Sequence, residues 1–123
     1  MTVLGPTDFV NEPDDRKAIG KVTGELPEEA YSLFRNDPVE DPELLKTASV
    51  VYRINDNVIP PIMICHGNKD RTVPYRQSER LYETLLSHNK EVLLYTVDGG
   101  GHGVDFWSET LIREIIRFVK ETV

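Results

Sequence analysis

A chain of 123 residues, 39% hydrophobic and 28% charged, is long enough for one domain with a buried core, and its composition excludes wholesale disorder. A net charge of −7 argues against a nucleic-acid or anionic-lipid partner, because binding to either requires a basic face. A single cysteine, Cys65, excludes an internal disulfide and a thiolate metal cluster.

The part of the chain before residue 48 predicts loops joined by short helices, because it is rich in Pro, Asp and Glu. Residues 26–34 are predicted as one helix, since Pro27 and two acidic residues occupy its first turn, as helix starts prefer. Residues 41–46 are predicted as another helix, with Asp41 as its N-cap.

The rest of the chain predicts two strands that alternate with two helices. Residues 61–66 form a short apolar run closed by Gly67, which is typical of a strand buried on both faces. Helical spacing then predicts a helix over 74–88, a second strand follows over 91–97, and a final helix runs from about 105 to 121. This order favours an α/β fold with parallel strands and a right-handed crossover. The final helix is expected to carry one apolar stripe, formed by Trp107, Leu111, Ile112, Ile115, Ile116 and Val119.

Ionisable side chains occupy the loops that follow the two predicted strands. Asp70 lies in the loop 66–74, and His102 lies in the glycine-rich loop 98–103. Because such loops meet at one edge of a parallel sheet, we expect the two side chains to come together. An acid that accepts from one imidazole nitrogen leaves the other nitrogen free to take a proton. The simpler alternative is that Asp70 only forms a turn and His102 is only a surface loop residue.

Other candidates around these loops are expected to be structural. Cys65 is interpreted as inert core, because burial in an apolar strand raises a thiol pKa. His66 is expected to support its loop. A metal site formed by His66, Asp70 and His102 is a weaker alternative, since their spacing matches no metal motif. No glycine loop has the spacing that cradles phosphate, so we expect neither a cofactor nor a metal.

Three segments resemble one known family. Residues 60–74, PPIMICHGNKDRTVP, are similar to the segment that carries the triad acid in esterase, lipase, prolyl-oligopeptidase-like and dienelactone-hydrolase-like α/β-hydrolases. Residues 99–103, GGGHG, resemble the segment with the triad histidine, and residues 5–9, GPTDF, resemble the turn after the sixth strand. The resemblance implies that Asp70 is the triad acid and His102 the general base.

The resemblance also implies a nucleophilic serine that we do not find in this sequence. In this fold the serine lies in a Gly-x-Ser-x-Gly elbow and precedes the acid and the histidine. None of the serines is flanked by glycines in that pattern: Ser32, Ser49, Ser78, Ser87 and Ser108. We therefore expect residues 1–123 to be the C-terminal portion of an α/β-hydrolase domain, nearly inactive alone, whose parent enzyme hydrolyses a small carboxylic ester. The alternatives are a non-catalytic binding or interaction module and a peptidase-like serine hydrolase.

The expected fold is a partial α/β-hydrolase with a three-stranded, mostly parallel sheet and flanking helices. Its strands, residues 1–4, 61–66 and 91–97, would be the last three of the family sheet. The strand at 1–4 would then leave an open edge, and open edges invite association. The chain is therefore expected to form a homo-oligomer or to pair with a missing N-terminal half through that edge.

The segment 11–47 is expected to be a lid or pocket insertion. Its apolar residues Tyr31, Leu33 and Phe34 would line an acyl pocket or, more simply, pack a short helix onto the sheet. No apolar run approaches the roughly 20 residues needed to cross a bilayer, and no signal peptide is visible. The chain is accordingly expected to be cytoplasmic and to have no membrane partner, an expectation that a signal peptide upstream of Met1 would overturn.

Overall fold

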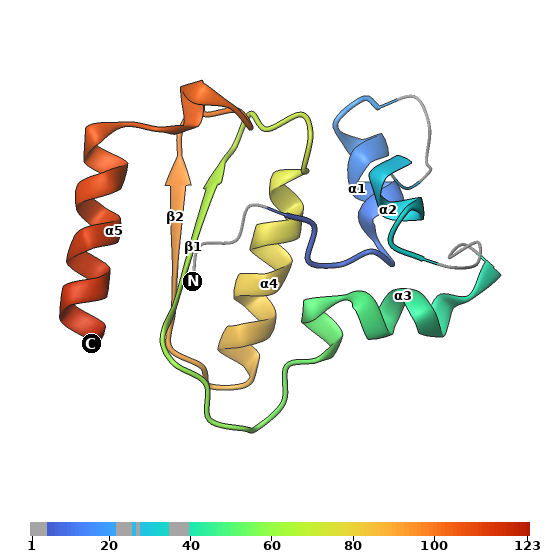
Figure 1. The fold of residues 1–123 in the computed structure, drawn as a ribbon, viewed down its shortest axis with the longest axis horizontal. Coiled ribbons are helices and arrows are strands. Elements are labelled where there is room, and N and C mark those ends of the chain that lie inside the picture. The colour runs from blue at the N-terminus through green and yellow to red at the C-terminus, as the bar shows by residue number, and fades with distance from the viewer. Residues whose placement is uncertain (1–4, 22–25, 27, 35–39) are drawn as a thin grey trace.

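The computed structural model describes residues 5–21, 26, 28–34 and 40–123. The described residues form a small parallel sheet with helices on both faces and further short helices beyond one of them (Figure 1). In chain order the elements are α1 (Glu12–Ala18), α2 (Glu28–Tyr31), α3 (Pro42–Ala48), the 3-10 turn η2 (Val50–Tyr52), β1 (Ile62–Gly67), α4 (Tyr75–Ser87), β2 (Val92–Val97), the 3-10 turn η3 (Val104–Phe106) and α5 (Glu109–Thr122).

The sheet pairs β1 with β2 in parallel, in a register that runs from Ile62 beside Val92 to Gly67 beside Val97. The predicted α/β architecture and parallel pairing are therefore confirmed. Both strands point the same way, and the loops that leave them lie at the same edge of the sheet (Figure 1). The third predicted strand, residues 1–4, lies outside the described residues.

Alternate residues of β1 face different helices, which explains why the strand is apolar throughout. Ile64 packs with Leu81 and Leu85 of α4 on one face. Met63 and Cys65 face the other way and pack in a cluster completed by Phe106 and Leu111, with Ile115 and Phe118 of α5 against it. The two helices thus bury the two faces of the strand that leads into the acid-bearing loop.

The helix α4 matches its prediction closely, whereas α5 begins later than predicted. Asn89, just past the end of α4, has a φ of 54°, the left-handed conformation that ends helices. The predicted start of the last helix near residue 105 is wrong, because residues 104–106 form η3 and Trp107 is extended. Ser108 is the true N-cap, and its hydroxyl accepts from the Leu111 N–H at 3.1 Å.

The apolar stripe predicted for the last helix is present, but it is only partly buried, and Trp107 lies before the helix rather than on it. Leu111 is buried, and Ile115 and Phe118 pack against the sheet. Ile112, Ile116 and Val119, at the margin of the same stripe, are about half exposed. No helix in the described part of the chain is both long enough and apolar enough to cross a bilayer.

The described residues between 5 and 52, which we call the N-terminal lobe, lie beyond α4 from the sheet (Figure 1). The lobe has its own small core of Phe9, Leu26 and Leu45, against which Tyr31 and Phe34 pack. The expectation that these two aromatic residues pack a short helix onto the sheet is thus right in part. They do pack against apolar residues, but in the core of the lobe rather than on the sheet. Leu33, the third residue of that prediction, is exposed.

The lobe helices differ from their predictions in length. The predicted helix over 26–34 is wrong in extent, since α2 spans Glu28–Tyr31 and is followed by a turn. The helix α3 begins at Pro42, and Asp41 is its N-cap as predicted, with its carboxylate accepting from the Leu44 N–H at 3.1 Å. The helix α1 was not individually predicted.

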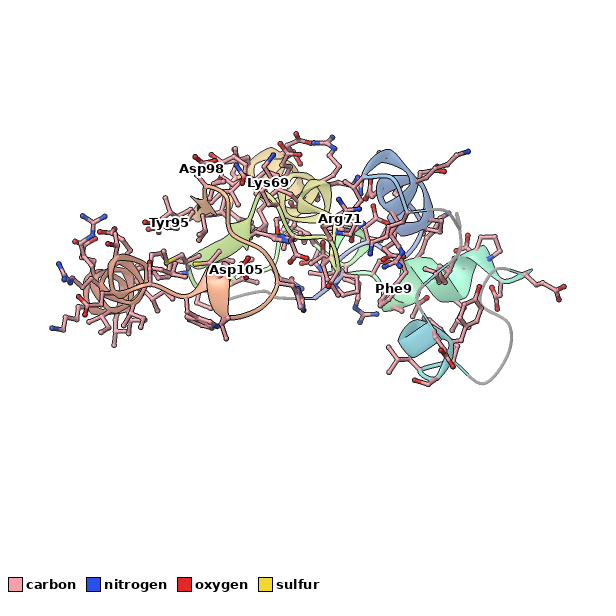
Figure 2. The ribbon with its side chains drawn as sticks, turned by 90° about the horizontal axis from the view of Figure 1, so that it is seen from above. Phe9, Lys69, Arg71, Tyr95, Asp98 and Asp105 are labelled. Carbon is pink, nitrogen blue, oxygen red and sulfur yellow. The ribbon has the colours of Figure 1, made fainter. Side chains whose placement is uncertain are left out.

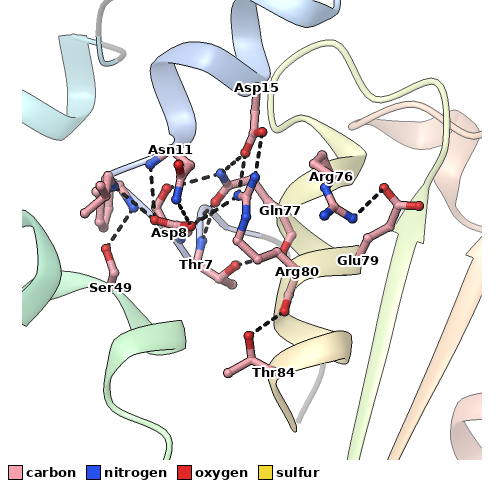
Figure 3. A network of polar contacts seen from close by, with 12 residues as sticks. Thr7, Asp8, Asn11, Asp15, Ser49, Arg76, Gln77, Glu79, Arg80 and Thr84 are labelled. Carbon is pink, nitrogen blue, oxygen red and sulfur yellow. Dashed lines mark hydrogen bonds and ion pairs between the residues drawn. The ribbon is translucent and has the colours of Figure 1, made fainter. Parts of the chain in front are cut away.

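A buried polar network joins the lobe to α4 (Figure 3). The Gln77 Oε1 accepts from the N–H groups of Thr7 at 3.0 Å and Asp8 at 2.9 Å, while its Nε2 donates to the Asp8 carbonyl at 3.1 Å and to Asp15 at 2.6 Å. Arg80, one turn further along α4, donates to both carboxylate oxygens of Asp15 at 2.7 and 2.9 Å and pairs with Asp8 at 3.2 Å. The lobe is therefore fixed in position against the helix that follows the acid-bearing loop.

Candidate active site

Asp70 lies three residues past the end of β1, in a turn that its own side chain stabilises. We call residues 68–74 the acid loop. The Asp70 Oδ1 accepts from the N–H groups of Thr72 at 2.8 Å and Val73 at 2.9 Å, as aspartate does in tight turns. The residue is only 7% exposed. The turn-forming alternative for Asp70 is thus real, but it uses one carboxylate oxygen and leaves the other for a different partner.

That partner is His102, in the loop that follows β2. We call residues 98–103 the histidine loop. The His102 Nδ1 lies 2.8 Å from the Asp70 Oδ2, so the structure brings the two predicted site residues together. The imidazole is 39% exposed. Among the described residues, none is hydrogen-bonded to its Nε2. With the proton held on Nδ1, the Nε2 lone pair is available to accept a proton.

A close backbone contact allows this pairing. A Cβ at Gly67 would lie 2.2 Å from the carbonyl oxygen of Gly100, so only glycine fits at the end of β1. The Lys69 N–H donates to the same carbonyl at 2.9 Å. Gly99, with a φ of +74°, supplies the left-handed turn that the histidine loop requires. Gly67 at the end of β1 thus has a steric reason, and Gly99 in the histidine loop has a conformational one.

Asn68 adds a second connection between the two loops. Its Nδ2 donates to the Asp98 carboxylate at 2.8 Å, and its Oδ1 accepts from the Gly99 N–H at 2.8 Å. Viewed from above, Lys69 and Asp98 lie near one another over the strand ends, while Phe9 lies far off in the lobe (Figure 2). No role for Asn68 is predicted from the sequence, although its place directly after a predicted strand is a signal for one.

His66 is a buried neighbour of Asp70. Its Nε2 lies 3.0 Å from the Val73 carbonyl and 3.2 Å from the Asp70 Oδ2, and its Nδ1 lies 2.5 Å from the Ser78 hydroxyl. Because both neighbours of Nε2 are acceptors, that nitrogen carries the proton and the Ser78 hydroxyl donates to Nδ1. Burial lowers the pKa of His66 although the Asp70 charge opposes the shift, so the ring is neutral at pH 7.

The geometry gives little support to a metal site at these residues. Both ring nitrogens of His66 are engaged in hydrogen bonds, which leaves no lone pair for a metal. Within the described ranges, no cluster of three or more His, Cys, Asp or Glu side chains is arranged to hold a metal ion. Cys65 is fully buried, and burial raises its pKa to about 11, as expected for an inert core thiol.

Asp70 is held in its ionised form. Burial raises the pKa of its carboxyl, but the hydrogen bonds from His102, Val73 and Thr72 outweigh burial and bring the pKa below its ordinary value. The carboxylate therefore accepts at both oxygens and carries the charge that stabilises a protonated His102. This arrangement suits an acid and base pair and requires a nucleophile beside Nε2.

The hydroxyls of the described serines have other partners. Ser49 donates to the Leu45 carbonyl at 2.6 Å, Ser78 bonds to His66, Ser87 donates to the Thr84 carbonyl at 2.7 Å, and Ser108 caps α5. None of these four hydroxyls is hydrogen-bonded to His102. Ser32 likewise has a contact of its own.

Comparison with known proteins adds a family and several structural relatives. The BD-FAE family model matches residues 1–85. Esterase LipC of Mycobacterium tuberculosis is 32% identical over 65 residues, which are 52% of this chain and 16% of LipC. The structure of a truncated carbohydrate esterase from gut microbiota is 26% identical, with a TM-score of 0.78 over 97% of this chain and 40% of that protein. A bifunctional GH43-CE protein of Bacteroides eggerthii has the same fold, with 22% identity and a TM-score of 0.79 over 97% of this chain and 15% of its own. The chain therefore spans less than half the length of each of these relatives.

Proposed function

This chain belongs to the BD-FAE family, within the esterase-like α/β-hydrolases, and on that premise we propose that it supplies the acid and the histidine of a serine esterase. One observation carries the proposal: the Asp70 Oδ2 lies 2.8 Å from the His102 Nδ1, and the opposite nitrogen of the same ring has no hydrogen bond among the described residues. An acid and imidazole in this relation form two thirds of a Ser-His-Asp triad.

The proposed reaction is ester hydrolysis through an acyl-enzyme. A serine supplied by a part of the protein outside these 123 residues attacks the ester carbonyl, and the His102 Nε2 takes the proton of its hydroxyl. His102 then gives that proton to the departing alcohol. In the second half, His102 takes a proton from water, the resulting hydroxide attacks the acyl group, and the proton returns to the serine. Asp70 stabilises the imidazolium in both halves.

The substrate class is a small carboxylic ester. The relative of known structure with 26% identity is a carbohydrate esterase, which favours an ester of a sugar among the small esters that the fold can accept. Within this chain, residues 11–47 are proposed to shape the pocket, since the described residues among them belong to a lobe with its own apolar core, and one of them, Arg16, contacts the acid loop. No cofactor enters this reaction.

A second candidate function is a non-catalytic interaction module. The observation that favours it is the outer face of α5, where Ile112, Ile116 and Val119 are about half exposed on one side of the helix. A face of this kind suits association with a second copy or with the rest of a larger domain. The active-site geometry at Asp70 and His102 has no role in this alternative, so the two functions can be separated.

Hydrolysis of an activated acetate ester tests the proposal. The 123-residue chain is compared with a version extended by the coding sequence upstream of Met1, where a Gly-x-Ser-x-Gly segment is expected. We expect turnover only in the extended protein and its loss in His102→Ala. Activity of the short chain that disappears in His102→Ala would place the nucleophile within these residues. Turnover by the extended protein that His102→Ala leaves unchanged would overturn the esterase proposal.

A further inference from the structure

We propose that Arg16 is a positioning residue for the triad acid, acting from helix α1 through the backbone of the acid loop. The inference rests on the proposed function, because it concerns how Asp70 is oriented toward His102. The Arg16 Nη1 donates to the Thr72 carbonyl at 3.2 Å. The backbone N–H of Thr72 in turn donates to the Asp70 Oδ1 at 2.8 Å. One residue of the acid loop, Thr72, therefore connects the guanidinium to the carboxylate.

Arg16 is held in place by the helix that carries it. Asp15, its neighbour on α1, accepts from Gln77 at 2.6 Å and from Arg80 at 2.7 and 2.9 Å. Both of these partners lie on α4, which begins at Tyr75, directly after the acid loop. Two consecutive residues of α1 thus contact the acid loop and the helix that follows it, so the loop cannot move relative to α4 without breaking one of these contacts.

The partner of Arg16 on its own helix is a buried acid. The Glu12 Oε1 lies 3.6 Å from the Arg16 Nη1, and their side chains are 1% and 16% exposed. Among the described residues, neither the Glu12 Oε2 nor the Arg16 Nε has a hydrogen-bond partner, although both are buried. Buried polar atoms without partners cost stability, and an apolar pair of similar volume is often as stable as a buried ion pair. The Glu12–Arg16 pair is therefore not explained by stability alone, whereas the contact of Arg16 with the acid loop gives the pair a role.

The acid loop is then fixed on two sides. On the side of β2, Asn68 and Lys69 hydrogen-bond to the histidine loop. On the side of the lobe, Arg16 holds the Thr72 carbonyl. The N–H groups of Thr72 and Val73 orient the Asp70 carboxylate only while the backbone that carries them is fixed. Loss of Arg16 should therefore loosen the bond from Asp70 to His102 without touching either side chain.

The test uses the double variant Glu12→Leu/Arg16→Met in the 123-residue chain. Two quantities are measured: the free energy of unfolding in urea, and the proton resonance of His102 Nδ1–H, which lies far downfield while it is hydrogen-bonded to Asp70. We expect the variant to be as stable as the parent chain or more so, because the buried ion pair and its unpartnered atoms are gone. We expect its Nδ1–H resonance to move upfield and to broaden or vanish. Arg16→Lys, with Glu12 kept, retains a donor and should retain most of the resonance.

Lys17→Met is the matched control, since Lys17 is exposed on the same helix; it should leave both quantities unchanged. An unshifted Nδ1–H resonance in a folded double variant would overturn the proposal. The proposal would also be overturned if the Nδ1–H resonance weakens only as far as the free energy of unfolding falls, and weakens equally in the double variant and in Arg16→Lys. That result would show that Arg16 only stabilises the fold. If the double variant fails to fold, Glu12→Gln/Arg16→Met, which also leaves no unpaired buried charge, is measured with the same criteria. The resonance does not depend on turnover, so failure of the esterase assay leaves this result unaffected.

Discussion

The sheet with its two helices and the N-terminal lobe are stabilised by different kinds of contact. In the sheet, alternate apolar residues of β1 pack under α4 and α5, and the two catalytic candidates extend from the strand ends. The lobe has a smaller apolar core and is joined to α4 by buried side chains such as Gln77, Arg80 and Asp15. The difference teaches that the site depends on two supports, an apolar one that places the strands and a polar one that places the acid loop.

The largest expected effect is a loss of activity when Asp70, at the end of the sheet, is replaced. In the N-terminally extended protein, Asp70→Asn should lower kcat about 10⁴-fold, because an amide cannot hold His102 in the required tautomer or stabilise its charged form. Steady-state hydrolysis of an activated ester measures the loss. Asp56→Asn, an exposed acid in the segment before β1 and outside both loops, is the control and should keep the activity. Comparable losses in both variants would contradict the assignment of Asp70.

The second effect tests the close contact between the two loops. A Cβ in Gly67→Ala would meet the Gly100 carbonyl oxygen at 2.2 Å, so the loops must separate, and we expect a loss of about 3 kcal/mol in the free energy of unfolding. Urea denaturation measures it. Gly5→Ala is the control, because a Cβ there meets no atom within 4 Å. Equal stability of the two variants would mean that the loops are not packed as the structure has them.

The third effect tests the polar contacts that join the lobe to α4, through a substitution at Gln77. Gln77→Ala removes the acceptor of two buried N–H groups and two donated hydrogen bonds, and it should cost about 3 kcal/mol, since the buried partners lose their bonds without gaining water. Urea denaturation again measures the loss. Glu79→Ala, on the same helix with a side chain 41% exposed, should change stability by less than about 0.5 kcal/mol. A small effect of Gln77→Ala would show that the lobe is held mainly by its apolar core.

The two regions also differ in how far the sequence predicts them. The strands 62–67 and 92–97 and the helix 75–87 follow from apolar runs and helical spacing, and the pairing of Asp70 with His102 follows from the topology. Trp107 was placed in the wrong element, because an N-cap at Ser108 decides the start of α5 and apolar spacing does not show it. Thr7 and Gln77 pair across 70 positions, and no periodic pattern records a contact between single polar side chains so far apart.

The smallest effect concerns the pH dependence of the lobe. Burial raises the pKa of Glu12 from 4.5 to about 7, an increase that the charge of Asp15 supports and that of Arg16 opposes. The unfolded chain ionises this group at lower pH than the folded chain does, so its contribution to stability is full below pH 4.5 and is lost as the pH rises through about 7. Between about pH 5.5 and 7 the parent chain should lose roughly 2 kcal/mol relative to Glu12→Gln, at about 1.36 kcal/mol per unit.

Urea unfolding of both chains across that range measures the difference, and Glu43→Gln serves as the control, because Glu43 is an exposed acid paired with Lys46 on α3. The control should follow the parent chain at every pH. If Glu12→Gln also follows it, the Glu12 side chain reaches water in solution, and the lobe does not hold Arg16 in the buried position from which it contacts the acid loop. A gap that grows as the pH rises toward 7 would show instead that Glu12 stays buried beside Arg16 and that its contribution to stability is lost on ionisation.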